Sequence, residues 1–563
     1  GQSNDGKNTP GCNGGNGAVA IFSGWTKTFG DPPFSLTAKA TSELPVTYTS
    51  SNTNVATISG STVTIVGTGS CTIYANQIGN SSFPAAQQVN QNLTVNAVSN
   101  TWNGNVSSDW NTSGNWSSNA VPAAGHDVII PDVSIQPIVN QASESAAICH
   151  DLSINLGATL TIAEGKSITV LGLLTNNAGT TGLVIESGGS LISSSANVSA
   201  TVKRAIPSNE WHLISSPITE AQAGIFAGYY LQRHSEPDKR YYDITELTDP
   251  LVPGSGYALY GSSSLSQAVF AGILNTGSIG ESNNLSRSGA AAGGLPFVDD
   301  YGWNLLGNPY PSSIDWLGSG WTKTNVENAI YIHRSSSTWA TFAGGVGNNG
   351  GSQYIAPGQG FFVHMTDAGA PYPRTGTVSM TDAARVHNNT SFFKNEEPIP
   401  DLLRLKISGN GYEDETVVRF LNEATTGFDS DFDARKLYGD VAEAAQIYTL
   451  GDMPLSINAL PASQVIPVGV KAGVSGTFSI SATEINDLPY VTLEDTKTGI
   501  FTELRKNTYQ FSLENGENEL RFKLHFSALA INEKDNSEAE IYSHANTVYV
   551  NFGSRTGELF IYN

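Results

Sequence analysis

The chain has 563 residues, of which 39% are hydrophobic and 14% are charged, and its 28 basic and 50 acidic residues give a net charge of −22. Such an acidic surface repels phosphate backbones and anionic headgroups, which argues against nucleic-acid and membrane-surface partners. No run of about 20 apolar residues predicts a membrane span. The length predicts about three to five domains, and the turn-rich composition predicts an all-β protein with less than about a tenth of its residues in helices.

Residues 1–17 have no apolar pattern and predict a Gly/Asn-rich arm. The three cysteines lack the spacing of a zinc site, and their spacing does not choose between the alternative disulfides. In a strand around Cys149, the apolar residues at alternate positions share one face and leave Cys149 on the other. This alternation favours a disulfide between Cys12 and Cys71, which would tie the arm to the following domain.

Residues 18–97 alternate between apolar and polar side chains, and turn residues separate the runs about every 8–12 positions, which is typical of a β-sandwich. The segments FGDPPFSLTAKATSELPVTYTSSNTNVATISGSTVTIVGTGSCTIYANQIGN and QNLTV resemble bacterial Ig-like repeats of the MBG and group-2 kind. That resemblance implies a spacer or adhesive module without catalytic residues.

Residues 98–206 begin with a Trp-rich polar loop and continue with short apolar runs that follow glycines. Evenly spaced runs of this kind predict the stacked strands of a short β-helix or β-roll. Trp102, Trp110 and Trp116 either close the end of this β-helix or stack on sugars. The pattern resembles a module found in proteins exported by type IX secretion. The glycine-led runs are Gly157–Ile162, Gly165–Val170, Gly182–Ile185 and Gly189–Ile192.

Residues 207–395 contain an internal repeat. Trp211–Pro217 returns as Trp303–Pro309, and the Pro-Gly turn before Tyr257 returns before Phe361. The region is therefore predicted to be a duplicated β-sandwich, with Trp211 and Trp303 at equivalent buried positions. Its segments GWNLLGNPYPSSIDW and APGQGFF again resemble type IX cargo.

Residues 396–527 are predicted to form a further β-sandwich, and residues 528–563 the strands of a partial sorting domain. The segments DETVVRF, GFDSDFDARKL, VTLEDTKTG and RFKLHF resemble the sandwich that precedes the type IX sorting domain. The segment AEIYSHANTVYVNFGSRTGELFIYN resembles the first strands of the sorting domain itself. These resemblances imply a secreted protein on the outer cell surface or in the extracellular space.

Catalytic motifs are missing from the sequence, which has no nucleophile elbow, no metalloprotease helix and no phosphate-binding loop. One acidic cluster offers a metal-binding alternative. Asp429, Asp431 and Asp433 alternate, and a strand would place them on one face, where they would either bind calcium or remain solvated. No other cofactor is expected.

The sequence therefore predicts an elongated string of Ig-like and jelly-roll-like β-sandwiches with one β-helix or β-roll segment. We expect a non-enzymatic cell-surface or extracellular structural protein, either an adhesive stalk or the subunit of a self-assembling filament. Its expected partners are head-to-tail copies of itself or other surface components. The alternative is a carbohydrate-binding or accessory component of a polysaccharide-degrading system, with Trp110, Trp116 and Trp339 as the residues that stack on a glycan. An enzyme with an unrecognised active site is the third hypothesis.

The filament hypothesis rests on both ends of the chain. The arm at residues 1–17 has little apolar surface to offset its ordering entropy, and the strand-like segments Ile541–Phe552 and Gly557–Tyr562 expose unpaired edges. A neighbouring copy would order both ends by strand addition, or else each end folds back onto its own domain.

Overall fold

The computed structural model describes residues 25–140, 146–262, 266–280, 284–290, 300–367, 369–388, 399–462, 465–517, 519–527, 540–544 and 547–551. The predicted all-β fold is confirmed, with 48% strand and 3% helix. In these ranges, we find no helix with the length and apolarity needed to cross a bilayer. The helical segments are the 3-10 turns η1 (Ser113–Asn115), η2 (Gly179–Thr181), η3 (Ala223–Phe226) and η4 (Asp382–Ala384).

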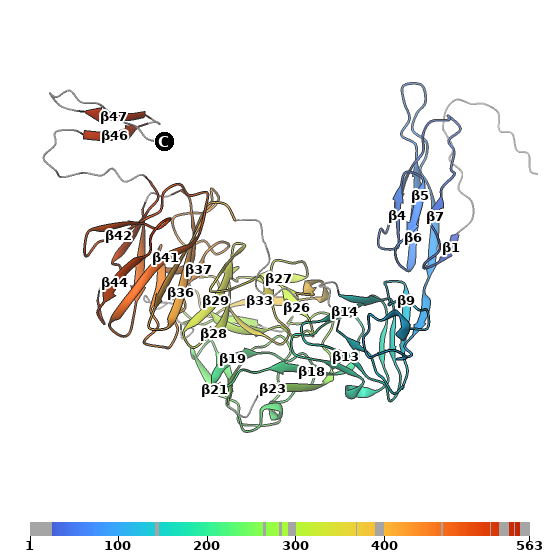
Figure 1. Cartoon of the computed structure of the whole chain (residues 1–563), viewed down its shortest axis with the longest axis horizontal. Helices are drawn as coiled ribbons and strands as arrows, with labels where there is room; N and C mark the ends of the chain where they lie inside the picture. The colour runs from blue at the N-terminus through green and yellow to red at the C-terminus, as the bar shows by residue number, and fades with distance from the viewer. Residues whose placement is uncertain are drawn as a thin grey trace, which may run out of the picture.

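The N-terminal domain consists of two sheets that share one apolar core, and it projects from one end of the molecule (Figure 1). Leu93 and Val95 of one sheet and Val63 of the other lie in this core. One sheet is formed by β1 (Trp25–Thr28), β7 (Val89–Asn96), β6 (Gly69–Asn76) and β3 (Thr47–Ser50), and the other by β2 (Phe34–Ser35), β5 (Thr62–Ile65) and β4 (Ala56–Ser59).

A three-sided parallel β-helix follows, as the glycine-led runs predict. Each turn of the chain adds one strand to each of three parallel sheets, and the apolar side chains point inward. The first sheet contains β8 (Val98–Thr101), β9 (His126–Ile130), β12 (Leu152–Ile154) and β15 (Leu174–Asn176). The second contains β10 (Ile138–Val139), β13 (Leu160–Ile162), β16 (Leu183–Ile185) and β18 (Ser199–Ala205), with β23 (Gln267–Ile273) antiparallel at its edge, and the third contains β11 (Ala147–Cys149), β14 (Ser167–Val170) and β17 (Ser190–Ile192).

The duplication is visible in the strand pairing. In the first half, β19 (Glu210–Ile214) pairs with β22 (Tyr257–Gly261), so that Trp211 lies opposite Tyr260. In the second, β25 (Trp303–Gly307) pairs with β32 (Gly360–His364) in the same register, so that Trp303 lies opposite His364. The first sheet continues with β20 (Leu231–Ser235) and β21 (Arg240–Asp243), and the second with β28 (Ile330–Ser335), β29 (Thr338–Ala343) and β30 (Val346–Asn348).

The two repeated tryptophans differ in burial. Trp303 is fully buried, as predicted, whereas Trp211 is only partly buried and packs against Tyr260. The prediction of two equally buried rings is therefore wrong for Trp211. Two smaller sheets complete the second half: β24 (Asn284–Arg287), β33 (Arg374–Met380) and β27 (Trp321–Thr324) form one, and β31 (Tyr354–Ile355), β26 (Ser313–Asp315) and β34 (Arg385–Val386) form the other.

The C-terminal sandwich is built from one 11-stranded sheet, most of whose apolar residues form one core. After it, in the region of the predicted segment Ile541–Phe552, β46 (Glu540–His544) pairs antiparallel with β47 (Thr547–Asn551), while the predicted segment Gly557–Tyr562 lies outside the described residues. The large sheet contains β43 (Ile500–Glu503), β42 (Thr492–Asp495), β45 (Phe522–His525), β40 (Val465–Lys471), β38 (Gln446–Leu450), β39 (Pro454–Leu460), β36 (Tyr412–Phe420), β35 (Leu402–Gly409), β41 (Gly476–Asn486) and β44 (Tyr509–Leu513), with β37 (Ala434–Arg435) on β39.

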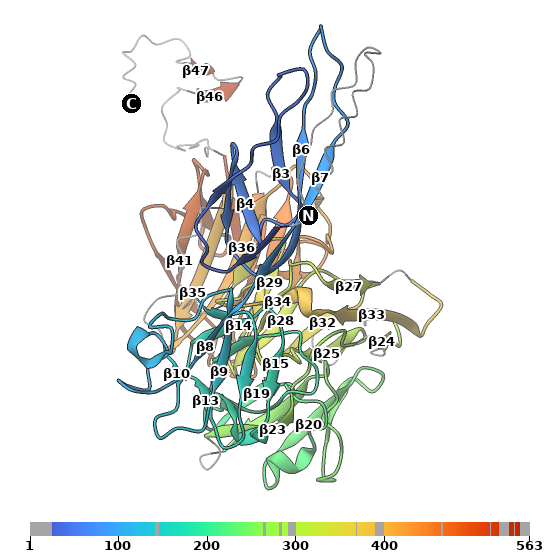
Figure 2. The ribbon, with the colours of Figure 1, turned by 90° about the vertical axis from the view of Figure 1, so that its right-hand side faces the viewer.

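Apolar cores cross the borders between these units. One core joins the interior of the β-helix to the first half of the duplicated region, and another joins both halves to the C-terminal sandwich. Figures 1 and 2 show the β-helix, the duplicated region and the sandwich packed side by side in chain order. These units therefore pack against each other through shared apolar interiors.

Candidate functional site

The tryptophans of the polar loop do not form a sugar-binding surface. The Trp102, Trp110 and Trp116 side chains are at most 1% exposed and lie in the core of the β-helix. The Trp116 ring packs edge-on at 4.9 Å from Trp102 and 4.7 Å from Trp110, and its Nε1–H donates to the Trp110 carbonyl. The predicted stacking role of Trp110 and Trp116 is therefore wrong, because both rings are already covered by protein. Closing the end of the β-helix, the other reading of these residues, agrees with their position.

Trp339, the third predicted stacking residue, lies elsewhere. It is on β29, 9% exposed, and its ring packs against His333 and Phe362. Its Nε1–H donates to the carbonyl oxygen of Tyr438 in the C-terminal sandwich. This prediction is also wrong, because Trp339 fills the core between two units.

The predicted calcium ligands do not converge. Residues 429–433 form a turn rather than a strand, so alternation does not align their side chains. Asp431 is exposed, Asp429 accepts hydrogen bonds from the backbone and hydroxyl of Thr425, and Asp433 accepts from the backbone of Asp429 and Ala459. Burial raises the pKa of Asp433 to about 7. The structure thus uses two of these carboxylates to hold the turn.

Cys71 and Cys149 are both buried and are not bonded to each other. Cys149 and Leu152 both lie in the core of the β-helix, although strict alternation predicted Cys149 on the opposite face. The chain turns a corner at His150, so the alternation of β11 does not continue into β12. Cys12 and the arm at residues 1–17 lie outside the described residues, and the Cys12–Cys71 disulfide stays a prediction.

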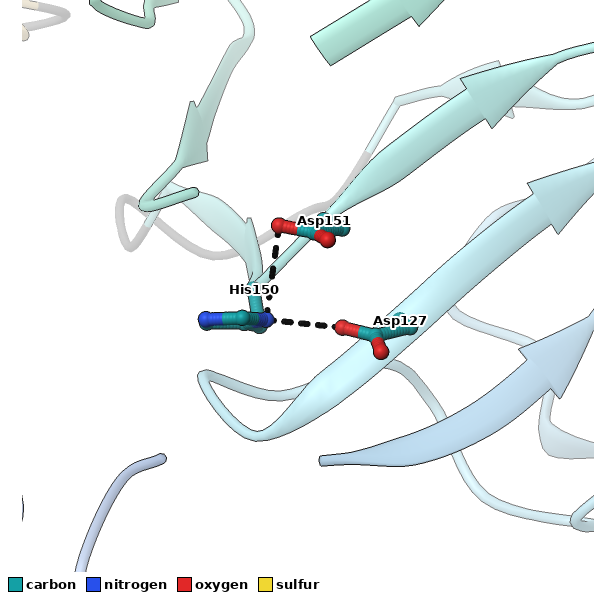
Figure 3. A group of neighbouring side chains, drawn as sticks. All are labelled: Asp127, His150 and Asp151. Atoms are coloured by element: carbon teal, nitrogen blue, oxygen red, sulfur yellow. Dashed lines mark hydrogen bonds and ion pairs between the residues drawn. The ribbon is translucent and has the colours of Figure 1, made fainter. Parts of the chain in front are cut away.

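The corner at His150 contributes to a group that the sequence reading missed. Asp127 lies on β9 directly before the inward-facing Val128, while His150 and Asp151 form the corner between β11 and β12, one turn of the β-helix later. His150 Nδ1 lies 2.7 Å from an Asp127 carboxylate oxygen and 3.4 Å from an Asp151 oxygen. Figure 3 shows both carboxylates approaching the same ring nitrogen. Within the described ranges, this is the one group of at least three side chains placed closely enough to hold a metal ion.

Solvent reaches this group, whose side chains are 31% to 41% exposed. One nitrogen and two carboxylate oxygens are ligands that suit zinc, with a water molecule as a fourth ligand. Without a metal, His150 Nδ1–H donates to Asp127, and the Asp151 carboxylate accepts the backbone N–H of Leu173 at 2.7 Å. The sequence does carry a signal for the group: the dipeptide His126-Asp127 returns as His150-Asp151 at the next turn.

A second cluster of ionisable side chains is closed to solvent. Glu327, 1% exposed, accepts hydrogen bonds from His364 at 2.7 Å and from Arg435 at 2.6 and 3.0 Å. Burial alone would raise the pKa of Glu327, but the His364 and Arg435 contacts hold it below its ordinary value. Arg435 belongs to the C-terminal sandwich and the other two to the duplicated region, so this cluster joins two units.

A cavity of about 410 Å³ opens at one end of the C-terminal sandwich. Its lining includes Phe420 and Phe526, whose rings pack edge-on at 4.9 Å. The lining contains three carboxylates, those of Asp401, Glu423 and Asp487, but no serine, cysteine, histidine, lysine or arginine. The lining residues are Pro400, Asp401, Phe420, Leu421, Asn422, Glu423, Ala462, Asp487, Leu488, Pro489 and Phe526.

Comparison with known families matches residues 101–526 to a family described as a domain of unknown function, DUF8693. The chain belongs to this family. The DUF8693 match covers the β-helix, the duplicated region and the C-terminal sandwich together, the same units that share apolar cores. No curated protein matches the chain.

Proposed function

We propose that this protein is a non-enzymatic extracellular structural protein, displayed at the cell surface as an adhesive stalk or as the subunit of a filament. Export through type IX secretion, association with copies of itself and contact with other surface components belong to the same proposal. The observation that carries it is the use of arginines that are buried or partly buried to join neighbouring units, which suits a body that must keep its shape under load.

Three arginines make these connections. Arg385, after the second half of the duplication, donates to the carbonyl oxygens of Leu191 at 2.6 Å and Ser193 at 2.7 Å in the β-helix. Arg204, in the last β-helix strand, donates to the Gln359 side chain at 2.9 Å. The third is Arg435 of the C-terminal sandwich, which donates to Glu327 of the duplicated region as described above. A guanidinium group fixes several acceptors at once, so each contact restrains both distance and orientation.

The chemistry of the accessible surface agrees with this reading. The lining of the 410 Å³ cavity has no serine, cysteine, histidine or lysine, and its ionisable groups are three carboxylates. The Glu327–His364 pair is buried away from solvent. The alternative, carbohydrate binding, was based on Trp110, Trp116 and Trp339. Their rings lie in apolar cores and are not available to stack on a sugar.

Electron microscopy of the purified full chain over a range of concentrations tests the proposal, together with immunogold labelling of the producing cells. We expect label on the outer surface and either discrete rods or continuous fibres. Light scattering on the full chain and on a chain without residues 1–17 separates the two: loss of fibres on deletion indicates a filament, and monomers in both samples indicate a stalk. Saturable binding or turnover of a polysaccharide, with label confined to the cell interior, would overturn the proposal.

A further inference from the structure

Lys436 and Asp414 form a buried pair inside the C-terminal sandwich. Lys436 directly follows β37, Asp414 lies on β36, and the Lys436 Nζ contacts Asp414 Oδ2. The Lys436 side chain is 2% exposed and that of Asp414 is fully buried. Taking both charges out of water costs several kcal/mol per ion, on the order of what their attraction returns. Conversion of the pair to an amide would remove both charges from the interior.

The remaining contacts of Asp414 hold its carboxyl group in a fixed orientation. Asn349 Nδ2–H donates to Oδ1 at 2.8 Å, and the backbone N–H of Ile447 donates to Oδ2 at 2.7 Å. Asn349 comes from the loop after β30 and Ile447 from β38, so two further elements fix the acceptor. The two oxygens therefore have different surroundings: Oδ2 faces the lysine, and Oδ1 faces an amide donor.

We propose that Lys436 and Asp414 are joined by an intramolecular isopeptide bond, which forms without a cofactor once the chain has folded. The inference does not depend on the proposed function, since it follows from this pair and its neighbours alone.

The reaction is a condensation. The Lys436 ammonium passes one proton to Oδ2 of Asp414, which leaves a neutral amine beside a carboxylic acid. The nitrogen lone pair forms a bond to the Asp414 Cγ, and negative charge gathers on Oδ1, where the Asn349 N–H already donates. The bond from Cγ to Oδ2 then breaks, its electron pair leaves with Oδ2, and a second proton from the nitrogen completes a water molecule. An amide remains between Nζ and Cγ.

Folding supplies the two conditions that this reaction needs. The reacting atoms are held in contact, which replaces an encounter in solution by an intramolecular step with a high effective concentration. The burial of both side chains also excludes the water that would hydrolyse the product. The resulting bond covalently closes the chain between residues 414 and 436 and fixes β36 to the segment after β37.

Mass spectrometry of the purified, folded full chain tests the proposal, after reduction and alkylation of the cysteines. We expect an intact mass lower than that of the sequence by one water molecule. We also expect trypsin to release peptide 407–419 joined to peptide 436–471, because an acylated Lys436 is not cleaved.

Matched variants distinguish the bond from other losses of water. Lys436→Arg keeps the charge but cannot form this amide, so the full sequence mass should return. Asp414→Asn should release ammonia instead and give a product with the same mass as the cross-linked wild type. Lys203 and Glu186, an ion pair at 2.8 Å with about 30% of each side chain exposed, should stay unlinked in every sample. Folded wild-type protein with its full sequence mass and free cleavage at Lys436 would show an ordinary ion pair and overturn the proposal.

Discussion

Replacing Arg435 by methionine should leave the Glu327 carboxylate buried without its arginine partner, in the apolar core between the duplicated region and the C-terminal sandwich. Methionine is close in length to the aliphatic part of arginine, so the change removes the charge and the three hydrogen bonds to Glu327 but little volume. His364 would remain as the partner of Glu327, at 2.7 Å. Breaking one side of a buried pair costs about 3–5 kcal/mol, because the other charge stays buried without compensation.

A second change should relieve most of this cost. In a double variant with Glu327→Gln and Arg435→Met, the glutamine side-chain oxygen still accepts the His364 Nδ1–H, and no buried carboxylate is left without a partner. We expect the double variant to regain more than half of the stability that the single variant loses. The difference is a coupling free energy between two residues that belong to different units.

The two forms should also respond to pH in opposite directions. In the wild type the Glu327 pKa is lowered, so its contribution to stability is complete above the ordinary pKa and is lost as the pH falls. In Arg435→Met, burial should raise the Glu327 pKa, and stability should then fall as the pH rises through it.

Urea unfolding of the full chain, followed by tryptophan fluorescence, measures these effects, and the Trp303 ring, 4.7 Å from the His364 ring, is a local reporter. Equal losses in the single and double variants, with the same pH dependence, would refute a charge-based explanation.

Three further predictions use the same unfolding assay. Trp303→Ala should cost about 3–5 kcal/mol by emptying a fully buried site, and Trp211→Ala clearly less, because Trp211 is only partly buried; the reverse order would contradict our assignment of the core. Burial lowers the pKa of His387 to about 4. As the pH falls from about 6.5 to about 4, the wild type should therefore lose up to about 3 kcal/mol of unfolding free energy relative to His387→Gln. Equal acid sensitivity of the two proteins would refute this. Burial raises the pKa of Asp433 to about 7, so the wild type should lose stability relative to Asp433→Asn as the pH rises through about 7, and a flat difference between about pH 5 and pH 9 would refute it.

The β-helix could be predicted from sequence because its signal is local. The four glycine-led runs coincide with β13, β14, β16 and β17, and each contains inward-facing apolar residues. The duplication was equally accessible, because both halves keep the tryptophan and the Pro-Gly turn in the same order. In both halves the residue three positions after the tryptophan pairs with the aromatic residue after the Pro-Gly turn.

Side-chain environments that depend on distant contacts could not be predicted in this way. Trp110 and Trp116 have polar neighbours in sequence, yet their rings are buried because the loop folds across the end of the β-helix. The repeated His-Asp dipeptide becomes meaningful only when the pairing of β9 with β12 places Asp127 beside His150. Local alternation also fails at a corner, which is why Cys149 faces inward.

Stacked parallel strands leave backbone donors and acceptors exposed at their last turns, which makes an open solenoid a template for polymerisation. Here the first turn is covered by the tryptophan loop, whose backbone at Ser108 and Trp110 bonds with Ile138. At the other end, β23 pairs antiparallel with β18, and the Arg385 guanidinium donates a hydrogen bond to the carbonyl oxygen of Leu191. At these positions the edges of the β-helix are already occupied by the chain itself, so a filament that grew by strand addition would have to use other edges.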